Sequence, residues 1–331
     1  MTTKERILAL LEENRGTPLS GEVLAEELGV SRTAVWKAIK DLQKAGHAIA
    51  AAQNRGYTLD TDSEVLSEQG VRLFLRTKSL NLVVAQELES TNLTAKQMAA
   101  AGAPHGTLVV ADSQTAGRGR RGRSFASPPG TGLYISMVLR SALPMQSAVL
   151  VTSAAAVAVC RAVERICGAS PGLKWPNDPV LGGRKLCGIL TELSLEAETG
   201  RLQYLVVGVG INVLHSREDF APELTEVATS LAQELGHPVS RPALTAALIE
   251  ELDRLYQALE DDDLEPYRNA YRAACVNLGK TVQLLEHGQR ETAQAVGIDD
   301  AFGLIVRDAD GRERVVRSGE VSVRGLYGYV D

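Results

Sequence analysis

Residues 107–123, TLVVADSQTAGRGRRGR, join an apolar, strand-like run directly to four arginines that are interspersed with three glycines. The glycines match the G-x-G-x-x-G fingerprint of dinucleotide-binding folds. That fold needs a helix directly after the glycines and an acidic residue about 20 positions later. Here PPG follows at 128–130, and residues 137–142 contain no acid. The stretch therefore predicts a strand followed by an irregular loop and argues against a dinucleotide-binding fold.

The arginines of this loop are close enough to repel one another. Two unit charges about 4 Å apart interact by about 1 kcal/mol in water, and glycines let the backbone approach a ligand closely. An anion among the arginines removes the repulsion, so we expect residues 117–127 to close over a phosphate or a carboxylate. A nucleic-acid-binding patch is the alternative. A nuclear targeting signal is disfavoured because the run follows a predicted strand directly.

Length and composition restrict the class of protein. The chain has 331 residues, 44% hydrophobic and 23% charged, and a net charge of -6. Such a length suits two or three domains, and the mild acidity argues against a wholly basic nucleic-acid coat protein. No apolar run approaches the ~20 residues that span a bilayer, and the N-terminus lacks the pattern of a secretion signal. Four cysteines without C-x-x-C spacing and five histidines without an HExxH motif predict reduced thiols, a cytoplasmic location and no dedicated metal site.

The first sixty residues predict a winged helix-turn-helix. Helical patterns over 4–14, 22–28 and 31–44 are followed over 47–59 by two short strands, whose turn places Arg55 at its tip. The third helix has an apolar stripe on one side and a basic face on the other, which suits contact with DNA phosphates and base edges. A protein-docking module with ordinary solvated lysines is the alternative. The predicted DNA-binding residues are Arg32, Thr33, Trp36, Lys37, Lys40 and Arg55.

A second group of chemistry-bearing residues lies further along the chain. KWPND at 174–178 combines an extended tryptophan, which offers a flat apolar surface, with a polar turn. Residues 184–193 and 202–213 predict two strands that form a hairpin centred near residue 199.

This hairpin gathers a cation, an amide and bare backbone at one end. Its predicted register places Lys185 roughly opposite Asn212, and Gly188 faces the stretch Gly208–Gly210. Glycine in a strand often marks a close approach to a ligand or to another part of the chain. We therefore expect a ligand to lie flat on this part of the sheet.

The remaining sequence predicts helices and strands around these motifs. Leucines recur every three or four residues over 244–259 and predict an amphipathic helix. From residue 276 onward the pattern changes to short strands, with a hairpin turn at Asp310-Gly311, which predicts a small β-barrel. The predicted domains are a winged helix-turn-helix over 1–64, a ligand-binding catalytic domain over 65–275 and a C-terminal β-barrel over 276–331.

The motifs occur together in one known family. Ser90-Thr91-Asn92, Gln114 before the arginine loop, KWPND, RKLCGIL and GVGIN follow one another as in the bifunctional biotin protein ligases and biotin operon repressors. The sequence resembles that family over nearly its whole length. The resemblance implies an α+β fold: a winged helix-turn-helix, a central mixed-sheet ligase domain of the class II synthetase type and a small C-terminal β-barrel.

The resemblance also implies a reaction and its partners. Biotin's carboxylate would attack the α-phosphate of ATP, with Mg²⁺ present, and biotinyl-5'-AMP would pass its biotinyl group to a lysine of biotin carboxyl carrier protein, a subunit of acetyl-CoA carboxylase. A ligand-promoted homodimer would bind operator DNA and repress biotin synthesis genes. A ligase whose N-terminal module is no repressor, a DNA-binding sensor without transferase activity and a lipoate-type ligase are the alternatives.

Individual roles follow by position in the family motifs. Lys185 and Arg118 would be catalytic, Lys185 against the carboxylate and α-phosphate, and Arg118 as a clamp on the intermediate. Asp178 would hold magnesium or receive the incoming ammonium, and the sequence leaves both open. The implied biotin-binding residues are Ser90, Thr91, Asn92, Gln114, Arg118, Gly119, Arg120, Lys185 and Gly188. The implied nucleotide-binding residues are Arg120, Arg123, Trp175, Asn177, Asp178, Gly208 and Asn212.

Overall fold

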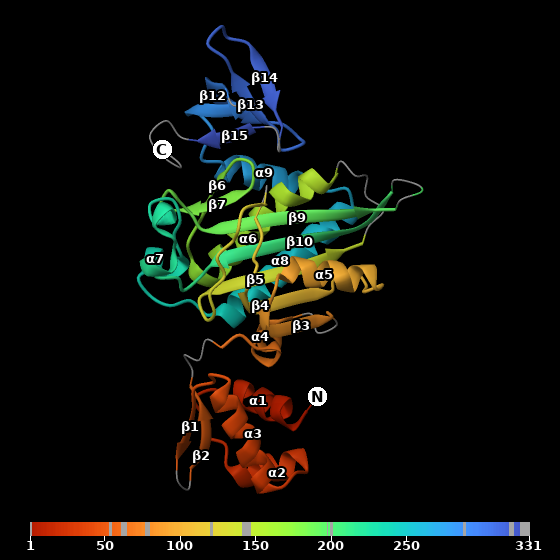
Figure 1. Cartoon of the computed structure of the whole chain (residues 1–331), viewed down its shortest axis with the longest axis vertical. Coiled ribbons are helices and arrows are strands. Elements are labelled where there is room, and N and C mark those ends of the chain that lie inside the picture. The colour runs from red at the N-terminus through yellow and green to blue at the C-terminus, as the bar shows by residue number, and fades with distance from the viewer. Residues whose placement is uncertain are drawn as a thin grey trace. The chain divides into compact units, whose positions relative to one another are not determined.

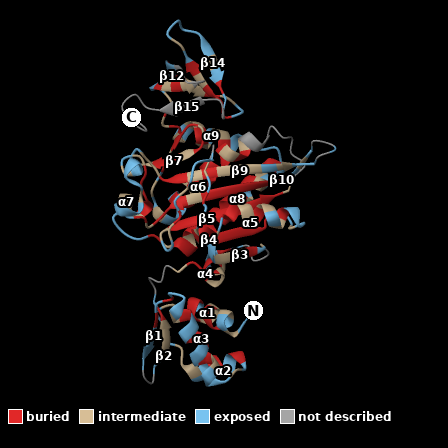
Figure 2. Cartoon of the chain, in the orientation of Figure 1, coloured by how far each residue is buried: buried red, intermediate tan, exposed pale blue. Residues whose placement is uncertain are grey.

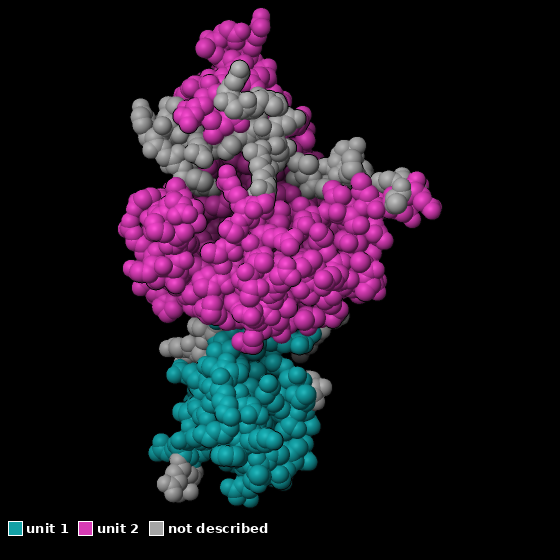
Figure 3. Space-filling view, in the orientation of Figure 1, with its two compact units in different colours: residues 1–78, 240–246 teal, residues 79–239, 247–331 magenta. Residues whose placement is uncertain are grey.

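The chain forms two compact units, residues 1–78 with 240–246 and residues 79–239 with 247–331 (Figure 3). Unit 1 contains the winged-helix region, and unit 2 contains the central and C-terminal sheets. Among the described residues, no helix combines the length and the apolar character that a membrane crossing requires. The computed structural model describes residues 2–52, 55–60, 65–76, 80–119, 122–140, 147–196, 198, 201–286, 289–317 and 321–324.

Unit 1 contains the winged helix-turn-helix that the sequence predicts. The first three helices begin at hydroxyl side chains, since Thr2, Ser20 and Ser31 each accept a hydrogen bond from the backbone N–H three residues on. Residues 53–54 of the predicted wing turn lie outside the described residues, and Arg55 is exposed. The elements are α1 (Thr3–Glu13), α2 (Gly21–Leu28), α3 (Arg32–Lys44), β1 (Ile49–Ala52), β2 (Gly56–Leu59) and α4 (Glu68–Phe74).

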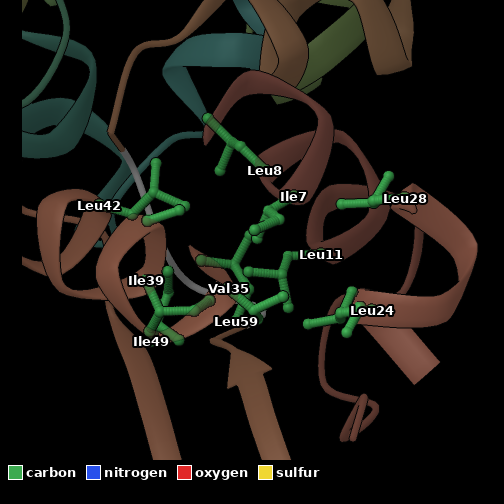
Figure 4. Packing of buried hydrophobic residues seen from close by; sticks show 12 residues of the cluster. Ile7, Leu8, Leu11, Leu24, Leu28, Val35, Ile39, Leu42, Ile49 and Leu59 are labelled. Carbon is green, nitrogen blue, oxygen red and sulfur yellow. The ribbon is translucent and has the colours of Figure 1, made fainter. Parts of the chain in front are cut away.

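An aliphatic core holds the helices and strands of this module together (Figure 4). Ile7, Leu11, Leu24, Val35 and Leu59 have 0% of their surface exposed. Burial of such a side chain contributes about 1.5–3 kcal/mol. Because the apolar stripe of α3 faces this core, its basic side is left toward solvent.

Unit 2 is built on a mixed sheet of five strands in the order β3-β4-β5-β10-β9. β3 and β4 are parallel, and the other neighbouring strands are antiparallel. Strands β4, β5 and β10 are largely buried (Figure 2), which matches their nearly continuous apolar sequences. The strands are β3 (Leu82–Leu88), β4 (Leu108–Gln114), β5 (Gly132–Leu139), β9 (Cys187–Leu195) and β10 (Leu202–Asn212).

Helices lie on both faces of this sheet. Asn92 of α5 (Thr91–Ala100) donates to Glu192 of β9 on one face, whereas Thr152 of α6 (Ser147–Cys167) donates to Thr191 of β9 on the other. Since alternate strand residues share a face, Gly188 lies on the face that α5 covers. The other elements of the central part are α6 (Ser147–Cys167), β6 (Gly172–Lys174), β7 (Asp178–Leu181), β8 (Arg184–Lys185), η2 (Arg217–Asp219), η3 (Pro222–Leu224), α7 (Leu231–Leu235), α8 (Arg241–Glu260) and α9 (Glu265–Ala274).

The C-terminal part is a small antiparallel sheet in the order β14-β13-β12-β11-β15 (Figure 1). The predicted hairpin turn at Asp310-Gly311 is confirmed, because Gly311 has a φ of 83° and its N–H donates to Asp308 O at 3.0 Å. The short strands that the sequence predicted after residue 276 are therefore present, and they form an antiparallel sheet where a β-barrel was expected. Its strands are β11 (Thr281–Glu286), β12 (Gln289–Ile298), β13 (Leu304–Arg307), β14 (Glu313–Val316) and β15 (Val321–Arg324).

Candidate active site on the central sheet

A network of polar side chains lies where the N-terminus of α5 meets β4 and β5. The backbone N–H of Thr91 donates to Gln114 Oε1 at 2.9 Å, and Gln114 Nε2 donates to Ser127 Oγ at 2.9 Å. Ser136 Oγ lies 2.8 Å from Thr91 Oγ1 and 2.6 Å from Asn92 Oδ1. We call these five residues the polar cradle. Its amide and hydroxyl groups are held by hydrogen bonds to one another and offer both donors and acceptors.

Asn92 is the most constrained member of the polar cradle. Its Nδ2 donates to Glu192 Oε2 at 2.9 Å and to Leu190 O at 3.2 Å. Burial raises the pKa of Glu192, but hydrogen bonds from Lys96 and Asn92 outweigh burial, and the net pKa is lowered. A Cβ at Gly208 would overlap Asn92 Oδ1. The structure thus places Gly208 against Asn92, whereas the sequence assigned this glycine to the nucleotide.

The predicted pairing of glycines across the hairpin is confirmed, because Gly188 of β9 lies opposite Gly210 of β10. The ring of Phe125 lies over this pair. A Cβ at Gly188 would come within 2.8 Å of the ring, and one at Gly210 within 2.6 Å. In this structure the ring of Phe125 therefore occupies the bare-backbone surface on which we expected a ligand to lie flat. Phe125 is not among the predicted site residues, although an aromatic side chain two positions after the last arginine was a usable signal.

The arginine loop turns back on itself, since Gly119 N–H donates to Arg123 O at 2.7 Å. The side chains of Arg118 and Arg123 are exposed, and Arg118 Nη2 lies 3.5 Å from Glu89 Oε1. Such an exposed pair contributes little and leaves the guanidinium available to an anion. Arg120, which the sequence assigned to both ligands, lies outside the described residues.

Lys185 and Asp178 form an ion pair at the end of the small sheet β6-β7-β8. Lys185 Nζ donates to Asp178 Oδ1 at 2.5 Å, and 34% of the lysine side chain and 20% of the aspartate side chain are exposed. The backbone of Lys185 is held as well, since its N–H donates to Val227 O at 2.7 Å. The ammonium is therefore positioned by a carboxylate and still accessible to a ligand.

Two predicted amides have structural contacts within the chain. Asn177 Nδ2 donates to Ile189 O at 3.1 Å, and Asn212 Nδ2 donates to Thr229 O at 2.9 Å. Across the strands, Asn212 N–H donates to Leu186 O at 3.0 Å, one position from the predicted partner Lys185. Asn177 thus ties the residue before β7 to β9, and Asn212 ties the end of β10 to the segment before α7.

Trp175 is buried, whereas the sequence treated it as a surface for a ligand. Only 1% of its surface is exposed, and its Nε1 donates to Phe302 O at 2.8 Å. Its backbone N–H donates to Asn277 Oδ1 at 2.7 Å. A nucleotide would reach this indole only after neighbouring side chains had moved. The structure thus gives Trp175 a contact with the C-terminal part that the sequence did not predict.

The predicted DNA-binding residues lie on the solvent side of unit 1. In α3 they share the face opposite the aliphatic core, and the indole of Trp36 is 53% exposed. An exposed tryptophan beside lysines suits a surface that contacts both apolar and charged groups of a partner. The exposed residues are Arg32, Thr33, Trp36, Lys37 and Lys40 in α3, and Arg55 next to β2.

Comparisons with known proteins agree with this arrangement of motifs. The biotin/lipoate A/B protein ligase family matches residues 84–212, an HTH domain matches 3–58, and the biotin protein ligase C terminal domain matches 278–324. The bifunctional ligase/repressor BirA of Bacillus subtilis is 34% identical over 95% of this chain and 97% of its own length. The chain belongs to the bifunctional ligase/repressor family. BirA of Escherichia coli is 29% identical over 98% of both chains.

Solved structures support the same family assignment for the part of the chain that matches biotin protein ligases. The biotin protein ligase from Aquifex aeolicus in complex with biotin and ATP is 28% identical, with a TM-score of 0.62 over 74% of this chain and 99% of that one. A biotin protein ligase-like protein from Silicibacter, 17% identical with a TM-score of 0.57, shares the fold. The predicted fold class, a winged helix-turn-helix followed by a mixed-sheet ligase domain and a small β-domain, is confirmed.

Proposed function

We propose that this chain joins biotin to a lysine of a carrier protein in an ATP-dependent reaction and acts as a biotin-responsive repressor. The main support is the order of the binding groups along β8 and β9. Lys185, which forms an ion pair with Asp178, lies three residues before Gly188. At Gly188 the ring of Phe125 covers bare backbone next to the polar cradle. A ligand would meet, in this order, a cation, an apolar aromatic surface and the amides of the polar cradle, which can bind a polar ring. Those are the groups that a carboxylated, ureido-bearing ring system needs.

In the first step, a carboxylate oxygen of biotin would form a bond to the α-phosphorus of ATP. The bond from that phosphorus to its bridging oxygen breaks, and pyrophosphate leaves with the electron pair. Negative charge from both substrates accumulates at the reacting centre. Lys185, already positioned by Asp178, and the guanidinium groups of Arg118 and Arg123 would stabilise it. The polar cradle would meanwhile orient the ureido ring.

In the second step, the amine of a carrier lysine would attack the carbonyl carbon of biotinyl-5'-AMP. The bond from that carbon to the phosphate oxygen breaks, AMP leaves with the electron pair, and the amine gives up its proton. Asp178 is a partly exposed carboxylate next to Lys185, and in this proposal it would receive the incoming ammonium and accept the released proton. Closing the arginine loop would keep water from the mixed anhydride. The carrier is expected to be the biotin carboxyl carrier protein of acetyl-CoA carboxylase.

Magnesium fits this site as a companion of the nucleotide. The described residues contain no group of three or more acidic, histidine or cysteine side chains that could hold a metal alone. Magnesium usually binds through one or two carboxylates together with substrate phosphates. Asp178 is the carboxylate that would serve, and the ion would neutralise phosphate charge.

The N-terminal module would supply repression. Lys37 and Lys40 would contact DNA phosphates, and Trp36 and Thr33 would reach base edges in the major groove. We propose that biotinyl-5'-AMP promotes a homodimer, since two winged modules suit a palindromic operator. The proposed domains are 1–64 for DNA, 65–275 for ligation and 276–331 as the C-terminal domain, in a cytoplasmic protein.

The decisive experiment is incubation with ATP, Mg²⁺, a biotin carrier domain and either biotin or lipoate. The expected result is a single lysine modified in the biotin sample, together with biotin-dependent exchange of labelled pyrophosphate into ATP. No adenylate with biotin, or a preference for lipoate, would refute the ligase proposal. Operator binding measured with and without both substrates tests repression, and equal affinity in the two conditions would refute it.

A further inference from the structure

Thr229 connects two residues of the candidate active site through its backbone. Its N–H donates to Lys185 O at 2.9 Å, and its carbonyl accepts the hydrogen bond of Asn212 Nδ2 at 2.9 Å. Thr229 has 0% of its surface exposed. Val227 O accepts the N–H of Lys185 at 2.7 Å, so residues 227–229 run alongside Lys185 as a short splint. The position of this splint therefore sets the backbone position of Lys185.

Glu234 of α7 holds the splint in place. Its Oε1 accepts hydrogen bonds from Thr229 Oγ1 at 2.7 Å and from Arg184 Nη2 at 2.6 Å. Arg184 directly precedes Lys185 in β8, so one carboxylate binds both the strand neighbour of Lys185 and Thr229, whose N–H donates to the carbonyl of Lys185. Only 17% of the Glu234 side chain and 31% of the Arg184 side chain are exposed, which reduces screening by solvent.

The turn between β7 and β8 leaves room for this carboxylate. Gly182 has a φ of +56°, and a Cβ at this position would overlap Glu234 Oε2. A larger residue would push the carboxylate away from Arg184 and Thr229. The glycine therefore serves the contact as well as the turn.

We infer that Glu234 is a positioning residue for adenylate formation, acting on Lys185 through Arg184 and Thr229. The inference rests on the proposed ligase function. A catalytic group displaced by about 1 Å can lower a rate about 100-fold, because the reacting atoms lose their alignment. Residues 227–229 make two hydrogen bonds to the backbone of Lys185 and one to the amide of Asn212. By holding these residues in place, Glu234 sets that alignment.

The test uses the full-length chain and biotin-dependent pyrophosphate exchange, with kcat and KM measured separately. Glu234→Leu keeps the size of the side chain and removes both acceptors, and it should lower kcat about 10- to 100-fold with little change in the KM for biotin. Glu234→Gln keeps an acceptor oxygen, and it should retain kcat within about fivefold, the equivalent of one neutral hydrogen bond. Wild-type kcat in Glu234→Leu would overturn the inference, as would equal losses in both variants.

Two further variants make every outcome informative. Glu313→Leu removes an ion pair of similar length, 2.7 Å to Arg307 in the C-terminal sheet, and it should keep wild-type kcat. If Glu234→Leu does not fold, Thr229→Val removes only the hydroxyl that bonds to Glu234, and unchanged kcat in that variant would equally overturn the inference. Absence of biotin-dependent exchange in the wild-type chain would instead refute the proposed function itself.

Discussion

Replacement of Lys185 by methionine should nearly abolish adenylate formation and leave the fold intact. Methionine retains an unbranched apolar stem but no charge. The lysine side chain is 34% exposed and its ammonium donates to Asp178, so little packing is lost. The variant therefore isolates the contribution of the ammonium to the transition state.

The size of the effect follows from distance and exposure. A unit charge about 4 Å from developing negative charge contributes about 4 kcal/mol at an effective dielectric constant of about 20. Partial solvent access at Lys185 lowers this value, and loss of one preorganised oxyanion donor typically costs about 3 kcal/mol. At about 1.4 kcal/mol for each factor of ten, kcat for pyrophosphate exchange should fall roughly 100- to 1000-fold.

Lys96→Met is the matched comparison. Lys96 is also 34% exposed and donates to a carboxylate, Glu192, at 2.7 Å. That carboxylate holds Asn92 of the polar cradle, so loss of Lys96 should raise the KM for biotin and leave kcat nearly unchanged. Pyrophosphate exchange at saturating biotin separates the two variants. A Lys185→Met enzyme within about tenfold of wild type would refute the role assigned to this ammonium.

Three further perturbations test other parts of the molecule. Gly210→Val should displace the ring of Phe125, to which a Cβ already comes within 2.6 Å, and calorimetric titration should show biotin binding weakened at least about tenfold. Replacing Lys37 and Lys40 by alanine should weaken operator and non-operator DNA alike and lower the salt slope by about one per lysine, which an operator-only loss would contradict. Burial first, and then nearby cations, lower the pKa of His47 to about 4, so the folded form binds fewer protons than the unfolded form between pH 4 and 6.5. Stability of unit 1 should therefore be lost as pH falls through that window, by roughly 2–3 kcal/mol, and His47→Gln should flatten the dependence seen in urea titrations.

Local patterns of apolar residues and glycines predicted most of the helices and strands. The leucine pattern over 244–259 predicted a helix that the structure has as α8 (Arg241–Glu260), because an amphipathic helix repeats its apolar residues every three or four positions. Gly188 was expected to face the Gly208–Gly210 stretch, and it lies opposite Gly210. Pairing was predictable here because a short turn fixes the register of a hairpin.

Contacts between distant segments were not predictable in the same way. Asn92 and Glu192 are 100 positions apart, and their hydrogen bond depends on how α5 packs on the sheet. The same holds for Glu234 and Arg184, 50 positions apart, which meet because the chain returns from β10 to run beside β8. Motif order predicted which residues would touch ligands, but the contacts that hold those residues in place are visible only in the tertiary structure.

Trp175 shows why a motif does not reveal the environment of each of its members. An indole is large and apolar, but its N–H needs an acceptor when it is buried. Phe302 supplies that acceptor from a left-handed backbone conformation, with a φ of 58°, and Asn277 binds the tryptophan backbone. Three residues later stands Asp178, the partner of Lys185. The segment that carries this carboxylate is thus anchored by the C-terminal part, so the position of the carboxylate depends on the folding of a sheet that contributes none of the predicted ligand-binding residues.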